Sequence, residues 1–127
     1  MNEIVTEWVD KAEDDFRVAQ LALSAPGESL TDIVCFHCQQ CAEKYLKSFL
    51  VEHRLRFQRT HALIELQHLC TTVAAEFTSL SPDLEELKDY AVEIRYPGLN
   101  TTLADAQNAV AAATRVRAFI RHKFGLT

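Results

Sequence analysis

The segment from residue 36 to residue 47 carries polar side chains whose types suit the binding of an anion. At about 100° per residue, one side of a helix here collects an imidazole, an amide and two cations: His37, Gln40, Lys44 and Lys47. These groups could hold an anionic ligand or form an oligomer contact. An ordinary solvated helix face explains them equally well. The other side is expected to face the core, with Cys35, Cys38, Ala42, Leu46 and Phe49.

Arg95 stands at the end of a predicted helix, directly before Tyr96-Pro97-Gly98. Its guanidinium offers a fork of donors, and the rings of Tyr90 and Tyr96 could stack nearby, where the Pro-Gly break frees backbone groups. Asn100 follows closely and its amide can hydrogen-bond a phosphate. The helix dipole also favours an arginine in a last turn whatever its function, which is the simpler alternative.

Cys35, Cys38 and Cys41 have a spacing that invites interpretation as a metal site. On a continuous helix these thiols spread over roughly a third of the circumference, so they cannot enclose one ion without ligands from elsewhere. In a reducing compartment, they and Cys70 are instead expected to be small buried thiols. We therefore predict no metal site and no cofactor.

Basic residues concentrate in two places, and either could bind phosphate. The first holds Lys44, Lys47, Arg54, Arg56 and Arg59, and the second holds Arg115, Arg117, Arg121 and Lys123. Both lie towards predicted helix C-termini, where the helix dipole stabilises cations without any ligand. The two explanations carry equal weight.

The composition favours helices, because only three glycines and three prolines interrupt 127 residues. With 48% hydrophobic residues the chain can build one core, so we expect a single domain over residues 1–127. A net charge of −5 argues against non-specific coating of nucleic acid or anionic membrane. No apolar stretch is long enough to span a bilayer, and the N-terminus lacks a signal-peptide pattern, which predicts a cytoplasmic protein.

Apolar periodicity predicts five helices, over about residues 3–24, 29–53, 60–77, 82–94 and 102–120. The buried face of the third is expected to hold Leu63, Leu66, Cys70, Val73 and Phe77. Their start signals include Ser29 with Asp32, Thr60, Ser81-Pro82-Asp83, and Thr102 with Asp105. Short connections imply antiparallel neighbours. The expected fold is all-α, an up-and-down four-helix bundle with one additional short helix, and the segment from Pro82 to Ile94 is the shortest.

Three motifs carry a resemblance to a known family: Phe36-His37-x-Gln39-Gln40-x-Ala42-Glu43-Lys44, Thr60-His61-x-Leu63, and Tyr90-Ala91-Val92-x-x-Arg95-Tyr96-Pro97-Gly98. With them the chain resembles the bacterial and archaeal HEPN proteins (higher eukaryotes and prokaryotes nucleotide-binding), from Trp8 to the last helix. The resemblance implies the same bundle, a homodimer, and frequently a partner encoded next to it, a minimal nucleotidyltransferase in a toxin–antitoxin arrangement.

Family members that cut RNA carry an arginine followed by a histidine about four to six residues later, which acts as general acid or base. Arg95 has no histidine at those positions, and Asn100 stands at one of them. An amide cannot exchange a proton at neutral pH. This departure argues against the usual metal-independent RNase site, unless His37 or His61 lies close to Arg95 in the folded protein and acts as the general acid or base.

Three hypotheses follow. The first is a homodimeric protein that binds a nucleotide or RNA and acts with a nucleotidyltransferase partner. Arg95 would then contact phosphate and Tyr96 or Tyr90 would stack on a base. His37, Gln40 and Lys44 would line the same cleft or the dimer interface. The second is a metal-independent endoribonuclease toxin with a non-standard site, and the third is a protein-interaction adaptor or antitoxin without a ligand.

Overall fold

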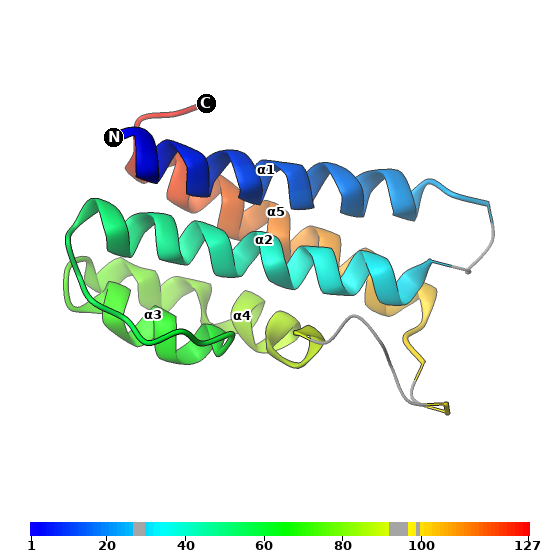
Figure 1. The fold of residues 1–127 in the computed structure, drawn as a ribbon. Helices are drawn as coiled ribbons and strands as arrows, with labels where there is room; N and C mark the ends of the chain where they lie inside the picture. Colours follow the sequence, from blue (N-terminus) through cyan, green and yellow to red (C-terminus); the bar gives the residue numbers. More distant parts are fainter. Residues whose placement is uncertain (27–29, 92–96, 99) are drawn as a thin grey trace.

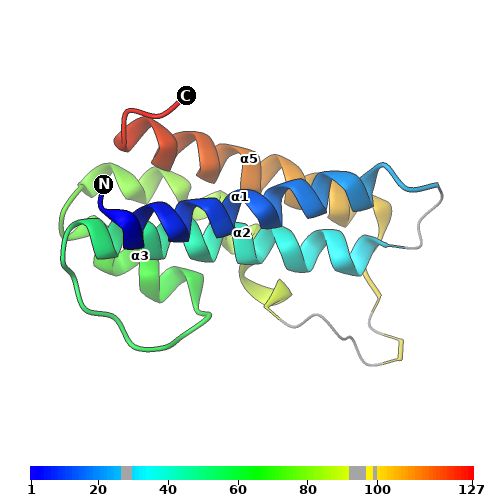
Figure 2. The same ribbon diagram turned by 45° about the horizontal axis from the view of Figure 1, so that its top comes forward.

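Three long helices form most of the molecule: α1 (Glu3–Leu23), α2 (Thr31–Glu52) and α5 (Leu103–Lys123). The computed structural model describes residues 1–26, 30–91, 97–98 and 100–127. Helix α2 packs against both α1 and α5, and the two chain termini lie at the same end of the bundle (Figures 1 and 2).

Shorter helices connect α2 to α5 and cover another side of α2: α3 (Leu63–Thr71), the 3-10 helix η1 (Ala75–Leu80), α4 (Ser81–Leu87) and the 3-10 helix η2 (Lys88–Tyr90). The described residues contain no β-strand, and the predicted all-α bundle is confirmed. The seven-residue α4 is the shortest α-helix among them, and it lies in the segment predicted to be shortest. No helix in the described part of the chain is long and apolar enough to cross a membrane.

Helix α2 is buried around most of its circumference, since 14 of its 22 residues are buried. The predicted core positions Cys38 and Leu46 are fully buried, and Phe49 is 3% exposed. The buried set also includes the polar residues Gln39, Glu43, Lys47 and Ser48. Because burying a polar group costs free energy unless it is hydrogen-bonded, the surrounding elements must supply partners for these side chains.

Local capping signals fix the starts of α1 and α5. The Asn2 side chain accepts a hydrogen bond from the backbone N–H of Val5 at 2.9 Å. The predicted capping box at α5 is confirmed: the Thr102 hydroxyl accepts from the Asp105 N–H at 3.0 Å, and the Asp105 carboxylate accepts from the Thr102 N–H at 2.9 Å.

The start of α2 is held differently from the prediction. Ser29 lies outside the described residues, and the Asp32 carboxylate accepts from the backbone N–H and the hydroxyl of Thr101, at 3.0 and 2.6 Å. The Thr31 hydroxyl donates to the Thr101 carbonyl at 3.2 Å. These contacts tie the first turn of α2 to the chain just before α5.

The third predicted helix is shorter than expected at both ends. It begins at Leu63 and not after Thr60, whose hydroxyl accepts from the Ala62 N–H at 3.1 Å. At the other end, the hydroxyls of Thr71 and Thr72 bond back to carbonyls three residues earlier, which competes with helical hydrogen bonding.

An extended residue, Ala74, then separates α3 from η1. Phe77 is buried as predicted, but it lies in η1. Val73 is 44% exposed, so its predicted place in the core is wrong, because the helical periodicity has ended before it.

The fourth predicted helix is also interrupted. Ser81 lies inside the first turn of α4, and its hydroxyl accepts from Nε2 of Gln67 at 2.9 Å, so its predicted capping role is wrong. Pro82 does occupy the first turn. After Leu87 the chain tightens into η2, a common way for a helix to end, so a continuous α-helix through residue 90 is wrong. Ile94 lies outside the described residues.

Candidate functional site

The polar residues predicted on one side of α2 do not form an open stripe, because Asp15 of α1 binds two of them. Oδ1 of Asp15 lies 2.8 Å from Nδ1 of His37, and Oδ2 lies 2.6 Å from Nζ of Lys44. The Asp15 side chain is only 10% exposed. The cation of Lys44 is therefore already paired within the chain, and this cluster fastens α1 to α2.

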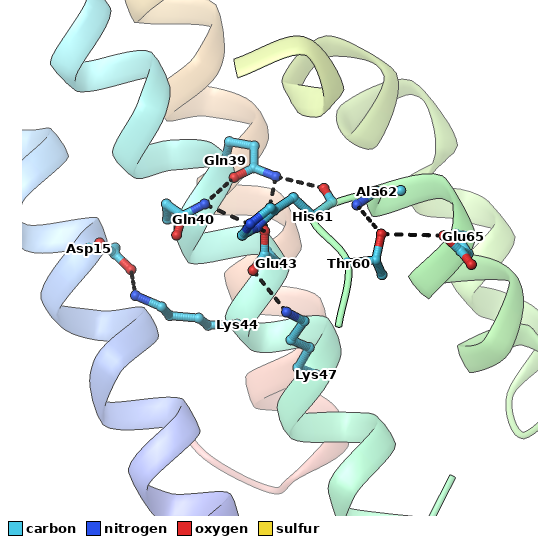
Figure 3. Close-up of polar contacts among 10 residues, drawn as sticks. All are labelled: Asp15, Gln39, Gln40, Glu43, Lys44, Lys47, Thr60, His61, Ala62 and Glu65. Carbon is cyan, nitrogen blue, oxygen red and sulfur yellow. Dashed lines mark hydrogen bonds and ion pairs between the residues drawn. The ribbon is translucent and has the colours of Figure 1, made fainter. Parts of the chain in front are cut away.

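A second polar cluster surrounds the Glu43 carboxylate (Figure 3). Oε2 of Glu43 accepts from Nζ of Lys47 at 3.0 Å, and Oε1 lies 2.8 Å from Nδ1 of His61. The side chains of Glu43 and Lys47 are 4% and 8% exposed, whereas that of His61 is 65% exposed. One buried carboxylate thus joins a buried cation to an imidazole at the surface.

Two glutamines complete this cluster. Nε2 of Gln39 donates to the His61 carbonyl at 3.0 Å and lies 3.4 Å from Oε1 of Glu43. Nε2 of Gln40 donates to Oε1 of Gln39 at 2.6 Å. Figure 3 shows these side chains of α2 facing the segment before α3. Backbone and side chain of His61 are therefore both held by α2, and one edge of its ring stays open to solvent.

A third cluster, around Glu13 of α1, joins α1, α2 and α5. Arg117 donates from Nε and from Nη2 to the Glu13 carboxylate, both at 2.7 Å, and Tyr45 donates to it at 2.6 Å. Burial opposes ionisation of Glu13, but the hydrogen bonds from Arg117 and Tyr45 outweigh it and lower the pKa of the carboxyl group. Burial, followed by the bond to Glu13, raises the pKa of the Tyr45 hydroxyl.

Arg95 and Tyr96, the first two predicted ligand-binding residues, lie outside the described residues. Tyr90 ends η2, half-buried and packed against the core, and Asn100 is exposed. The described geometry therefore brings His37 and Lys44 together through Asp15, and places Gln40 in the Glu43 cluster.

The second basic concentration is engaged in ion pairs. Arg115 binds Asp83 at 2.8 Å, Arg117 and Arg121 bind Glu13, and Lys123 binds Glu76. In the first concentration, Lys44 and Lys47 are paired as described, but Arg54, Arg56 and Arg59 are exposed. Within the described part of the chain, no carboxylate forms an ion pair with any of these three arginines.

All four cysteines are buried free thiols, as predicted. Burial raises the pKa of Cys38 and that of Cys70 to about 12, so both thiols stay protonated and act as small core residues. Over the described ranges, no group of three or more His, Cys, Asp or Glu side chains is placed to hold a metal ion.

Sequence reasoning missed Asp15 and gave Glu43 no role of its own. A signal for Asp15 was present: it falls between Ala12 and Ala19 on the apolar face of α1, where a carboxylate needs a partner. Glu43 similarly lies four residues after Gln39 and three before Leu46, all buried on α2.

Comparisons with known proteins agree with this architecture. The HEPN domain family model matches residues 5–123. The crystal structure of ST0689, an archaeal HEPN homologue, is 25% identical, with a TM-score of 0.74 over 97% of this chain and 98% of that one. The crystal structure of TT1696 from Thermus thermophilus is 23% identical, with a TM-score of 0.75 over 97% and 99%. A search of curated proteins finds no match.

Proposed function

Because this chain belongs to the HEPN domain family, we propose that it binds a nucleotide or RNA and acts with a nucleotidyltransferase partner, as a homodimer in a toxin–antitoxin system. The observation that carries the proposal is the family match over residues 5–123, nearly the whole chain. Fold alone does not fix function, so the proposal depends on the experiments that follow.

Calorimetric titration with nucleotides and with short RNA is the direct test. We expect heat of binding with at least one of them, from the protein alone or in complex with a nucleotidyltransferase encoded beside it. Absence of binding in both settings would reject the proposal. Light scattering should give a mass about twice the 14.4 kDa of one chain.

In this proposal Arg95 contacts a phosphate, Tyr96 or Tyr90 stacks on a base, and Asn100 hydrogen-bonds the same ligand. We expect Arg95→Ala to weaken ligand binding about tenfold or more, the cost of losing a charge-assisted hydrogen bond. Arg115→Ala is the matched control, because Arg115 is paired with Asp83. Equal affinities of the two variants would exclude Arg95 from the site.

His37, Gln40 and Lys44 enter the proposal as residues along the ligand cleft or the dimer interface. Since Asp15 holds both His37 and Lys44, the proposal requires Asp15 to position them. Asp15→Asn should then weaken ligand binding or dimer formation while the helical content stays unchanged.

A second candidate function, a metal-independent endoribonuclease toxin, is favoured by one observation. His61 has a carboxylate at Nδ1 and an exposed ring, an arrangement that orients an imidazole for proton transfer. RNA cleavage without added metal should then be lost in His61→Ala and in Arg95→Ala. It should be retained in His68→Ala, which changes an exposed histidine of α3. An inert wild-type protein would reject this candidate.

A further inference from the structure

The connection between α2 and α3, residues 53–61, carries a run of exposed basic residues. Its sequence, His-Arg-Leu-Arg-Phe-Gln-Arg-Thr-His, contains three arginines and two histidines and no acidic residue. All five basic side chains are exposed. This concentration is unusual in a chain with a net charge of −5.

The arginines of this connection differ from the other basic concentration in their ion pairing. Every cation of the 115–123 concentration has a carboxylate partner, whereas Arg54, Arg56 and Arg59 have none among the described residues. A carboxylate paired with an arginine offsets the positive potential of that arginine, so the pair attracts a phosphate less strongly than an unpaired arginine does. The structure thus decides between two basic concentrations that are equivalent in the sequence.

The connection is also fastened to the bundle at Leu55 and Phe57. Leu55 and Phe57 are partly buried against the core, so the alternating residues Arg54 and Arg56 point outwards. The Leu55 N–H bonds to the Leu50 carbonyl at 2.9 Å, and Lys47 lies 5.8 Å from the centre of the Phe57 ring. A surface ordered before binding loses less conformational entropy when a ligand arrives.

His61 lies at the C-terminal end of this surface, and hydrogen bonds fix the orientation of its imidazole. Its carbonyl is held by Gln39 and its Nδ1 by Glu43, so Nε2 is the ring nitrogen left for a ligand. In the neutral ring that carries its one hydrogen on Nδ1, directed to Glu43, Nε2 is an acceptor. A ribose 2′-hydroxyl can donate to that acceptor, and a deoxyribose has no such group.

We propose that residues 53–61 form a binding surface for single-stranded RNA. Arg54, Arg56 and Arg59 contact successive phosphates and Nε2 of His61 accepts from a 2′-hydroxyl. The three arginines are spread over up to about 17 Å of extended chain, which suits a strand better than a single mononucleotide. This inference rests on the proposed function, and it adds a second RNA-contacting surface to the ligand-binding residues named there.

The test is fluorescence anisotropy with a labelled single-stranded RNA of about twelve nucleotides, over a series of salt concentrations. Arg56→Gln/Arg59→Gln should weaken binding at least about tenfold at low salt and reduce the slope of log K against log salt by about 1.4, or 0.7 for each lost phosphate contact. The matched control is Lys11→Gln/Arg17→Gln, which removes the same charge from exposed positions on α1 that form no ion pair with any described residue. It should change affinity less than about twofold.

A parallel titration with DNA of the same sequence tests His61. Wild-type protein should prefer RNA by about threefold or more, the value of one hydrogen bond, and His61→Ala should lose that preference. His68→Ala should keep it.

The outcomes separate this inference from the function it rests on. A wild type that binds neither RNA nor nucleotide overturns both. Three outcomes overturn only the surface proposed here: the wild type binds nucleotide but no RNA, both double variants weaken RNA binding equally, or neither variant weakens it. Equal affinity for RNA and DNA overturns the part assigned to His61.

Discussion

Nδ1 of His61 lies 2.8 Å from Oε1 of Glu43, although the Glu43 side chain is 4% exposed and the His61 side chain is 65% exposed. The pair therefore runs from the buried side of α2 to the surface of the α2–α3 connection. Lys47 occupies the other oxygen of the same carboxylate. A charge-compensated pair in the interior thus fixes the direction of an imidazole outside it.

The Glu43–Lys47 pair predicts strong non-additivity in stability. Lys47→Met leaves a buried carboxylate without its cation, and Glu43→Gln leaves a buried ammonium without its anion, so each should lower the free energy of unfolding by about 3 kcal/mol. The double variant should cost clearly less than the sum, because no uncompensated charge remains. Urea unfolding of all four proteins measures the coupling, and additive costs would show that the pair is not isolated from solvent.

Glu13 predicts a loss of stability in acid. Its folded pKa is lower than its unfolded value, so its contribution is complete above the unfolded pKa of about 4.5 and is lost as pH falls through the folded pKa. Glu13→Gln should therefore flatten the decline of unfolding free energy between about pH 5 and pH 3. Glu3→Gln, at an exposed position in the first turn of α1, is the control. If the unfolding free energy of Glu13→Gln declined in acid as steeply as that of the wild type, Glu13 would not be a source of the acid sensitivity.

Arg54 has a backbone φ of 58°, directly after the C-cap of α2, where glycine is usual. Arg54→Gly should raise the free energy of unfolding by about 1 kcal/mol by relieving this left-handed conformation. Arg54→Ala keeps the strain and should give no such gain, while both variants lose the same side chain at the RNA surface. Thermal unfolding separates them, and equal melting temperatures would exclude backbone strain at this position.

The capping box at the start of α5 should contribute measurably to the free energy of unfolding. Thr102→Ala removes the hydroxyl that accepts from the Asp105 N–H and should cost about 1 kcal/mol, whereas Thr102→Ser keeps it and should cost a few tenths. Chemical unfolding gives both values. A Thr102→Ala variant as stable as the wild type would mean that water satisfies the same group equally well.

Much of the fold could be read from the sequence because it depends on neighbours three or four residues apart. The apolar faces of α1, α2 and α5, the box at Thr102 and the burial of the cysteines are of this kind. The start of α4 was predicted wrongly, because the Ser81 hydroxyl accepts from Gln67, a residue of another helix, and no local signal marks this contact.

The candidate site shows the same division. The sequence determined which residues carry charge: the lysines of α2, the arginines of both concentrations and His61. Only the tertiary structure decided which charges are free, because Asp15 reaches Lys44 from another helix and Glu13 reaches Arg117 from the other end of the chain. Ion pairing depends on distance in space, and the packing of α1 and α5 on α2 sets that distance. That packing leaves Arg54, Arg56 and Arg59 unpaired within the described residues.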